Sequence, residues 1–488
     1  MKRPTSLFLL AALAGALLAG CAAGPDFQRP TPPQEDRYRA GASDSAASEA
    51  ANAAAGMPAL VAGEAPPRQW WKLFGSPALD AIVERALARN RTIVEASATL
   101  ARAQALADAA EGGRTPQVDL TAGAGRQKYG AQFLGTLAKP PPFDYYAAGA
   151  SVGYTVDVAG ALTRTIEERR AHTEGEQRQL EAARLAVTGQ AVAAAIRIAS
   201  VRAQIATAEA VLERDRENLK LVHVAFDAGS VSRLDIVSAD SQLASDATLI
   251  PPLRQELATA RHALAVVVGD PAGAAPMAEP ELAALTLPAR LPISVPSELA
   301  ARRPDILAAE AQLHAATAAV GVATANLYPH IELTASFGQQ ATEIGHLFDR
   351  SSGVFGLAGS LIAPLVDGGT RRAEKRAAEE AMHASAARYE QTVLVAFGQV
   401  ADTLDAIGHG HEQWQAQGRA RDAALDNVDL TQKSYHEGNV GVLQVLDAER
   451  LYQQARLGYV RADAQRYLDA AQLMLALGGA GPEELVAR

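Results

Sequence analysis

The feature that most constrains this chain is an internal duplication. The segment PQVDLTAGAGRQ at residues 116–127 returns 213 residues later as PHIELTASFGQQ, and FDAGSVSRLDIVSAD at 226–240 returns 209 residues later as YHEGNVGVLQVLDAE. Repeats of 20–50 residues build solenoids, whereas these two similar, much longer offsets predict two large structural halves. The chain should therefore have pseudo-twofold symmetry, which makes an asymmetric enzyme pocket a poor first hypothesis.

The composition favours helix contacts over a thick core. Hydrophobic residues make up 48% of the chain but aromatic residues only 5%, and small side chains such as alanine allow helices to approach closely. The net charge of −10 and the pI near 5.6 leave no basic surface for nucleic acid, so we expect no nucleic-acid partner.

The N-terminus has the features of a bacterial export signal. Lys2 and Arg3 precede an apolar run that is too short to span a bilayer, and the run ends in Leu-Ala-Gly-Cys at Cys21. This order is typical of a lipobox, which predicts a signal peptide over 1–20 and a lipid on Cys21. The alternative is an ordinary signal peptide with an incidental cysteine. Cys21 is the single cysteine, so no intramolecular disulfide can form, and we expect no later membrane-spanning helix.

The rest of the chain divides into a tether and two similar repeats. Residues 22–66 are rich in Pro, Ala, Gly and Ser, which predicts an extended, poorly ordered tether. Trp70, Trp71 and Phe74 indicate where it docks, and Ser76-Pro77 predicts a helix start, with helical spacing continuing to about Ala110. The expected segments are 21–76 (lipidated tether), 77–268 (first repeat), 269–301 (proline-rich linker), 302–477 (second repeat) and 478–488 (tail).

Each repeat contains two strand candidates. Apolar residues alternate with small or polar ones in four segments, which are 118–124, 146–158, 331–337 and, less cleanly, 354–366. Strands of about ten residues can span an outer membrane. Four strands cannot close a barrel, and an open sheet edge is not viable in lipid. Either the sheet is soluble, or several chains share one barrel, and three chains would supply twelve strands.

Long helices follow the strands in both repeats. The stretches 160–228 and 369–437 would each extend about 100 Å as helices. Apolar residues recur at every seventh position, from Ile198 to Phe226 and from Val393 to Tyr435, with one break at Arg421. This period predicts supercoiled helical hairpins. The expected tips are Gly229–Arg233 and Gly438–Val442, and Pro251-Pro252 should kink or end the first return helix.

The sequence contains no recognisable enzyme motif. Its ten histidines are scattered, and it has neither an HExxH nor a GxSxG pattern. We therefore expect no catalytic residue, no metal site and no cofactor.

In this order and duplicated, the motifs resemble the TolC-like outer membrane efflux factors, and more closely their NodT-type lipoprotein branch that serves RND pumps. The matching motifs are CAAGPDFQRP, WWKLFGSPALDAIVERALARN, ARRPDI and YHEGNVGVLQVLDAE. The resemblance implies a mixed, mainly α fold. Three protomers would form a 12-stranded transmembrane β-barrel, with four strands per chain, continued by a periplasmic α-helical barrel with an equatorial domain around it.

The resemblance also assigns residues to a periplasmic gate. Leu443 and Asp447 match the family's constricting leucine and acidic positions, and Gln444 stands where some members carry a second Asp. Tyr435 and Asp235 match residues that link neighbouring hairpins and hold the gate shut. Val440 replaces an arginine found in some members, which argues against a salt-bridge lock. The tip residues expected to contact an adaptor are Gly229, Ser230, Val231, Gly438, Asn439, Val440 and Gly441.

The implied function is a passive exit duct of a tripartite efflux system. Its expected partners are two further copies of the chain, a periplasmic adaptor (membrane fusion) protein, an inner-membrane RND-type pump and outer-membrane lipid. The alternative is a structural envelope lipoprotein or adhesin that uses its coiled coil as a scaffold. Channel currents would distinguish the two hypotheses.

Overall fold

The computed structural model describes residues 22–31, 38, 57–64, 66–130, 141–275 and 277–479. The chain is mainly helical and forms two compact units. One unit combines residues 1–30, 99–177 and 308–390, and the other combines 31–98, 178–307 and 391–488. Both units therefore contain segments of both repeats.

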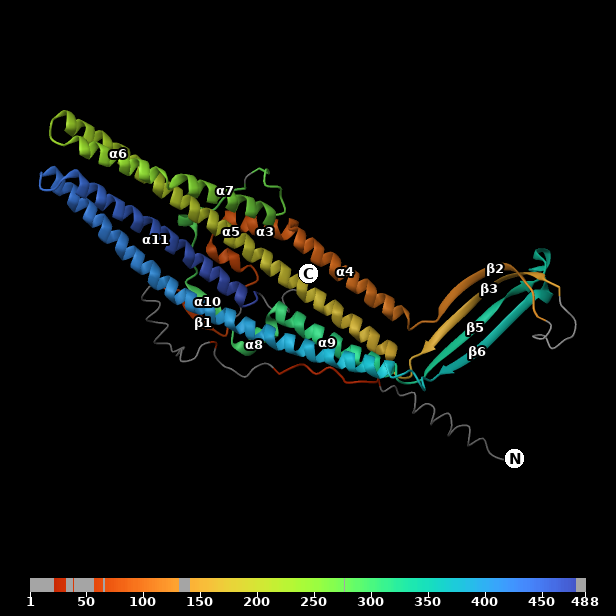
Figure 1. Ribbon diagram of the computed structural model, residues 1–488. Helices are drawn as coiled ribbons and strands as arrows, with labels where there is room; N and C mark the ends of the chain where they lie inside the picture. The colour runs from red at the N-terminus through yellow and green to blue at the C-terminus, as the bar shows by residue number, and fades with distance from the viewer. Residues whose placement is uncertain are drawn as a thin grey trace. The chain divides into compact units, whose positions relative to one another are not determined.

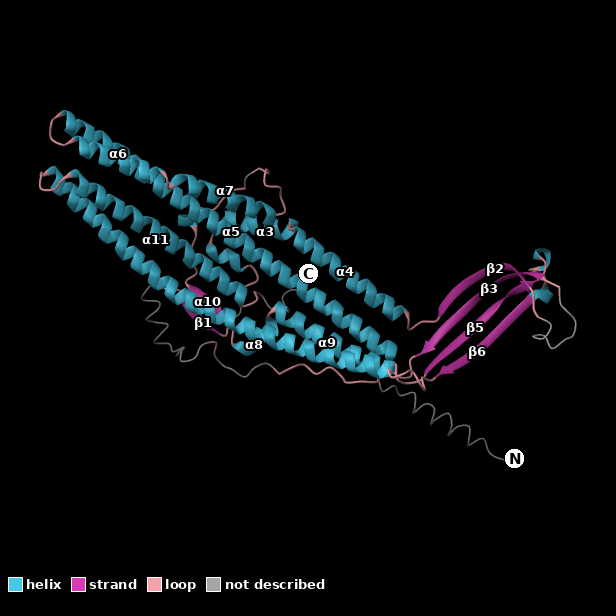
Figure 2. Cartoon of the chain, viewed as in Figure 1, coloured by secondary structure: helices cyan, strands magenta, loops and turns pink. Residues whose placement is uncertain are grey.

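The first unit contains a four-stranded antiparallel sheet (Figure 2). Its strands are β2 (Gln117–Gln127), β3 (Phe143–Val156), β5 (His330–Ala341) and β6 (Gly353–Ile362), in the order β2-β3-β5-β6. The central β3–β5 pair joins the two repeats, with Ser151 opposite Ser336. All four strand predictions are confirmed in kind. The fourth strand is shorter than predicted and ends at Ile362, because Pro364 lacks the N–H that a ladder needs.

The two faces of this sheet differ in chemistry. The register places Leu120 opposite Ala150, and Ala150 opposite Phe337, which is opposite Phe355. Leu120, Phe337 and Phe355 are strongly exposed on this apolar face. The other face carries small and polar residues, including Asp119, Thr121, Ser151, Glu332, Thr334 and Ser336. Gly149 and Gly338 lie so close together that a Cβ on either would collide with the neighbouring backbone.

Residues 22–30 belong to the first unit and are held in place, in contrast to the predicted loose tether. Buried Arg164 donates to the carbonyl oxygen of Ala23 at 3.2 Å and to Asp26 Oδ1 at 2.6 Å. The Phe27 ring stacks on His314 with centroids 4.4 Å apart. Gly24 has φ +91°, and a Cβ there would lie 2.5 Å from Gly321 Cα. The compositional argument failed here because a few specific contacts outweigh a disorder-prone composition.

Two helical hairpins dominate the second unit (Figure 1). The long helices are α5 (Ala161–Asp227) and α10 (Thr370–His436), as predicted to within one residue at each end. The first hairpin returns through α6 (Arg233–Ala247) and α7 (Ile250–Val267), and the second through α11 (Val442–Ala476). The predicted break is confirmed, since Pro251 and Pro252 open α7.

The predicted first helix is two helices, α3 (Pro77–Arg89) and α4 (Arg91–Gly112). Asn90 separates them, with its side-chain amide donating to the Val267 carbonyl oxygen at 2.7 Å and its Oδ1 accepting from Thr92 N–H at 2.8 Å. The corresponding helix of the second repeat is α9 (Pro304–Ala325). The linker is more ordered than expected, because β4 (Arg290–Ile293) pairs in parallel with β1 (Ala59–Ala62).

Short elements complete the two units. Trp70 and Phe74, on the 3₁₀ segment η1 (Trp70–Phe74), are buried as predicted, and Phe74 packs against Tyr467 of α11. Each fully buried aromatic ring contributes about 1.5–3 kcal/mol. The second unit also contains η2 (Leu282–Ala284) and α8 (Pro296–Arg302), and the first unit contains η3 (Ile344–His346) and η4 (Arg350–Ser352).

Two helices, α5 and α9, contain windows that are apolar enough to span a membrane, with mean hydropathy 1.2 and 1.3. The prediction that no later stretch would reach this level was therefore wrong by this criterion. Alanine raises the hydropathy of both helices, and more than half of each window is buried inside the protein. These helices have the pattern of core helices, so the finding is weak evidence for a membrane span.

Candidate functional site

The candidate site is the pair of hairpin tips in the second unit. Both long helices end in a glycine with left-handed backbone geometry, Gly229 at φ +75° and Gly438 at φ +77°. Ser230 N–H donates to the Ala225 carbonyl oxygen at 2.8 Å, and Asn439 N–H donates to that of Ser434 at 2.9 Å. These bonds form the same Schellman cap at both tips.

The return helices begin differently. In the first hairpin, the Ser232 N–H and hydroxyl both donate to Asp235 Oδ2 at 2.8 Å, which forms a capping box on α6. At the equivalent positions the second hairpin has Gly441 and Gln444, and no side chain caps α11. A capping side chain contributes about 1 kcal/mol, so the start of α11 is held less firmly than that of α6.

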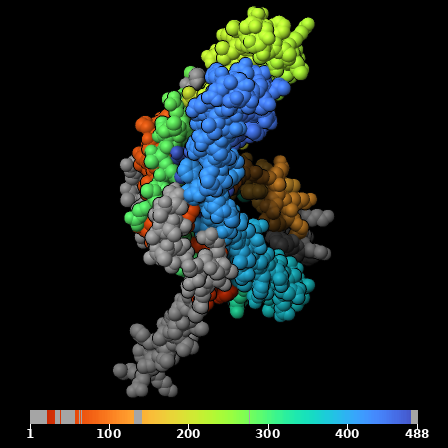
Figure 3. Space-filling model, turned by 90° about the vertical axis from the view of Figure 1, so that its left-hand side faces the viewer, coloured from red at the N-terminus to blue at the C-terminus, as the bar shows by residue number. Residues whose placement is uncertain are grey.

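An apolar cluster joins the two tips. Buried Val222 of α5 and Ala239 of α6 pack with Val442 and Leu446 of α11, and Leu219, Val231, Ile236 and Tyr435 surround them. Figure 3 shows the yellow-green tip of the first hairpin beside the blue tip of the second. We call these eight residues the tip cluster. The tip cluster packs the ends of the two hairpins of one chain against each other.

The predicted gate residues lie on the opposite face of α11 from the tip cluster. Leu443, Gln444 and Asp447 are all exposed, while Val442, Val445 and Leu446 are buried. Asp447 is not an isolated charge, because Arg450 Nη2 lies 2.6 Å from its Oδ1. The structure therefore brings the three predicted residues together on one surface. It also adds a cation that the sequence prediction had not considered.

Tyr435 and Asp235 are not linked to each other within the described part of one chain. Tyr435 packs against the tip cluster, while the Asp235 carboxylate accepts the two capping bonds from Ser232. The predicted link that these residues make between neighbouring hairpins therefore stays a prediction. The predicted adaptor-contacting residues all lie in the two tip loops or at their ends, and most of them are exposed.

Below the tip cluster, polar side chains of three helices meet at the buried Glu449. Asn218 of α5 and Gln432 of α10 both donate to the Glu449 carboxylate of α11, Gln432 at 3.0 Å. Asp215 of α5 and Asp246 of α6 are also buried in this region. The sequence prediction missed this polar band. In the sequence, this band is indicated only by acidic residues at heptad positions whose neighbours are apolar, as at Asp215.

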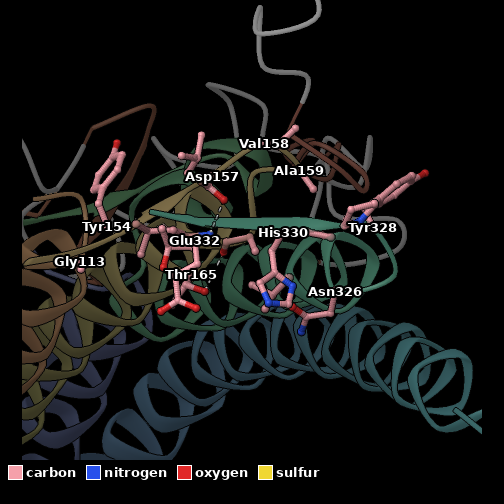
Figure 4. Close-up of a pocket in the computed structure, with 18 of the residues that line it drawn as sticks. Gly113, Tyr154, Asp157, Val158, Ala159, Thr165, Asn326, Tyr328, His330 and Glu332 are labelled. Atoms are coloured by element: carbon pink, nitrogen blue, oxygen red, sulfur yellow. Dashed lines mark hydrogen bonds between the residues drawn. The ribbon is translucent and has the colours of Figure 1, made fainter. Parts of the chain in front are cut away.

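A hollow of about 890 Å³ in the first unit lies where strands meet helices (Figure 4). Its lining includes Asp157, His330 and Glu332. Asp157 accepts from the N–H groups of Leu162 at 3.0 Å and Thr163 at 2.8 Å, so it caps the start of α5. This carboxylate therefore has a structural role. Among the described residues, no group of three or more His, Cys, Asp or Glu is placed to hold a metal ion.

Cys21 and the predicted signal peptide lie outside the described residues. The described chain begins at Ala22, whose neighbour Ala23 donates its N–H to the Ala159 carbonyl oxygen at 3.0 Å. Ala159 lies just after β3. The residue that follows Cys21 is therefore located next to the end of a sheet strand.

Known proteins share this architecture. The family described as outer membrane efflux protein matches residues 82–270 and 295–479. The chain is 32% identical over 419 residues to the pyoverdine export outer membrane protein OpmQ of Pseudomonas aeruginosa, covering 84% of this chain and 87% of that protein. It is 26% identical over 464 residues to the probable outer membrane lipoprotein SilC of Salmonella typhimurium, covering 95% and 96%.

The fold agrees with these sequence matches. The structure superposes on the outer-membrane channel OprN with a TM-score of 0.84 and 28% identity, covering 94% of this chain and 99% of that chain. The family match covers both repeats, and its two ranges leave out only the middle of the linker between them. This chain belongs to the outer membrane efflux protein family, as the resemblance of its motifs predicted.

Proposed function

We propose that three copies of this efflux protein form a passive exit duct whose periplasmic end is gated by the hairpin tips. The observation that carries the proposal is the four-stranded sheet, with one apolar face, one polar face and two unpaired edges at β2 and β6. Pairing β6 of one protomer with β2 of the next closes twelve strands into a barrel. The apolar face then contacts lipid, and the polar face lines the lumen.

Trimerisation is obligate in this proposal. A lone protomer would leave the N–H and C=O groups of both edge strands unpaired, and lipid offers no partners for them. A stable monomer in detergent, observed by mass photometry, would contradict it.

The lipid on Cys21 is a second anchor. The contacts of residues 23–27 hold the chain beside the strand end at Ala159. An acyl group on Cys21 would therefore enter the membrane leaflet at this end of the barrel. One acyl chain binds a membrane only marginally, but several chains and a barrel together bind firmly. Cys21→Ala should lose acyl label and shift part of the protein out of the outer membrane fraction.

The gate consists of Leu443 and Asp447 from three protomers, with Gln444 beside them. Their exposure on one face of α11 supports this assignment, because a side chain that lines an axis must be free of its own protomer's core. A Tyr435–Asp235 contact between protomers would hold the hairpins closed. The loops 229–231 and 438–441 would meet the periplasmic adaptor, which connects the duct to an RND-type pump.

Single-channel recording in planar bilayers tests the proposal. We expect stepwise currents from the wild-type trimer, and a larger open conductance when Tyr435→Phe is combined with Asp235→Ala. A hydrogen bond to a charged group contributes about 1.5–3 kcal/mol, so its loss should loosen the gate without holding it open. The complete absence of current would favour a scaffold instead.

A further inference from the structure

The first hairpin has an acidic pair in its core. Buried residues recur at every seventh position of α5 as Val201, Ala208, Asp215 and Val222, and in the return helices as Ala239, Asp246 and Leu253. Asp215 is only 3% exposed and Asp246 only 7%. Each aspartate occupies a position whose neighbours in the ladder are apolar. The pair lies between the tip cluster and a second apolar cluster that includes Leu212 and Ile250.

Asp215 has no hydrogen-bond donor to accept from. Neither of its carboxyl oxygens receives a bond from an N–H or hydroxyl group of the described residues. The charged groups that act on it are the carboxyls of Asp246 on α6 and Glu449 on α11. Each of those two has an amide donor, since Gln242 donates to Asp246 at 2.7 Å and Asn218 and Gln432 donate to Glu449.

Two carboxyl groups can bond to each other only when one carries a proton. Two ionised carboxylates buried without a cation would repel strongly. A bound metal is an alternative way to neutralise them, but among the described residues no group of three or more His, Cys, Asp or Glu is placed to hold one. A proton shared between Asp215 and Asp246 would remove the repulsion and give the Asp215 oxygens a partner.

We propose that Asp215 and Asp246 share a proton that locks α5 to α6, and that this lock positions α11 and the gate residues upon it. The inference rests on the gate assigned above. Glu449 connects the pair to the gate, because it lies one turn or less from Leu446 of the tip cluster and from Asp447. Loss of the proton adds a negative charge next to Glu449 and loosens the tip.

The direction of the pH dependence follows from the burial of the pair. Burial, reinforced by the carboxyl of Asp246 and then by Glu449, raises the pKa of Asp215 to about 7. Because the pKa of Asp215 in the folded protein is above the ordinary value of 3.8, the proton stabilises the folded hairpin fully when the pH is below 3.8. This stabilisation of the folded hairpin is lost as the pH rises through about 7. The closed tip should therefore become weaker on the alkaline side of neutrality.

Hydrogen exchange on the intact trimer tests the lock directly. After correction for intrinsic exchange rates, the opening equilibrium of amides in α6 and at the start of α11 should be about tenfold larger at pH 8 than at pH 6. The reason is that opening follows the ionised fraction of Asp215, whose pKa is about 7. Asp215→Asn should abolish this dependence, since an asparagine amide can donate to Asp246 without a titrating proton. Asp240→Asn, at an exposed acid of α6, is the matched control and should keep it.

Infrared difference spectra add a readout that does not depend on channel activity. A protonated carboxyl band should be present at pH 6 and absent from Asp215→Asn. If Asp215→Asn fails to fold, Asp246→Asn should remove the same band and the same pH dependence. Equal pH dependence in wild type and the asparagine variants, or no protonated carboxyl band, would overturn the proton lock. An absence of current in every variant would instead overturn the duct, whatever the exchange data show.

Discussion

The two helical hairpins are copies of one unit, yet they are stabilised by different chemistry. In the first, the core positions 215 and 246 are aspartates, and the 209-residue offset places Ala424 and Ala455 at the equivalent positions in the second. The return helix is broken and capped in the first hairpin but continuous and uncapped in the second. The duplication preserved the tip loops, while the helices beside them diverged.

In the second hairpin, two arginine side chains stack on aromatic rings. The Arg466 guanidinium lies 3.9 Å from the Trp414 ring centroid, and the Arg421 guanidinium lies 4.1 Å from that of Tyr459. This contact explains the break in the heptad ladder at Arg421. Burial raises the pKa of Asp463, but here the nearby Arg466 cation opposes the shift. The two hairpins therefore differ in what surrounds a buried acid, which is a second acid at Asp215 and a cation at Asp463.

The largest expected effect comes from removing the aromatic support of the second hairpin. Trp414→Ala should destabilise α10–α11 by about 3 kcal/mol or more, because it removes a large ring and its contacts with Arg466 and Tyr459. Ile205→Val, at the equivalent ladder position of the first hairpin, should cost about 0.5–1.5 kcal/mol. Local opening energies from hydrogen exchange would measure both. Equal costs would remove the proposed difference between the hairpins.

The next largest effect should come from the polar band that connects the hairpins. Glu449→Ala leaves the Asn218 and Gln432 amides without their shared acceptor, which should cost about 2–3 kcal/mol. Its first-hairpin counterpart Asp240 is exposed, so Asp240→Ala should change stability by less than about 0.5 kcal/mol. Thermal unfolding of the trimer in detergent would compare them, and a neutral Glu449→Ala would show that Glu449 does not support the tip.

A smaller effect is expected at the return-helix starts. Ser232→Ala should weaken the first tip by about 1 kcal/mol through loss of the capping box. Gly441→Ser combined with Gln444→Asp would build the same box on α11, and it should slow exchange at the start of that helix. If α11 gains no protection, the missing cap is not the reason for the difference between the tips.

The smallest energetic effect concerns the gate charges. Because Arg450 lies beside Asp447, Asp447→Ala should reduce cation selectivity only modestly, whereas Arg450→Ala should increase it by exposing three uncompensated carboxylates. Reversal potentials in asymmetric salt would measure both variants. Unchanged selectivity in the two would place the constriction elsewhere.

The sequence by itself determined the elements that depend on local or periodic patterns. Heptads predict α5 and α10, and alternation predicts the four strands. Glycine and proline predict both tip loops and the break between α6 and α7. The same signals misjudged the helix after Ser76 and the ordered arm at 22–30. In both places a long-range contact decides the structure, from Asn90 to the Val267 carbonyl oxygen and from Arg164 to Asp26, and no local pattern encodes such contacts.

Only the tertiary structure decided which polar residues meet. Asp215 and Asp246 are 31 residues apart, and Glu449 is more than two hundred residues from both. Their burial together depends on how three helices pack, as does the pairing of β3 with β5 across the two repeats. A heptad pattern specifies that a position is in the core, but the helix that faces it decides whether a charge there finds a donor, a cation or a second acid.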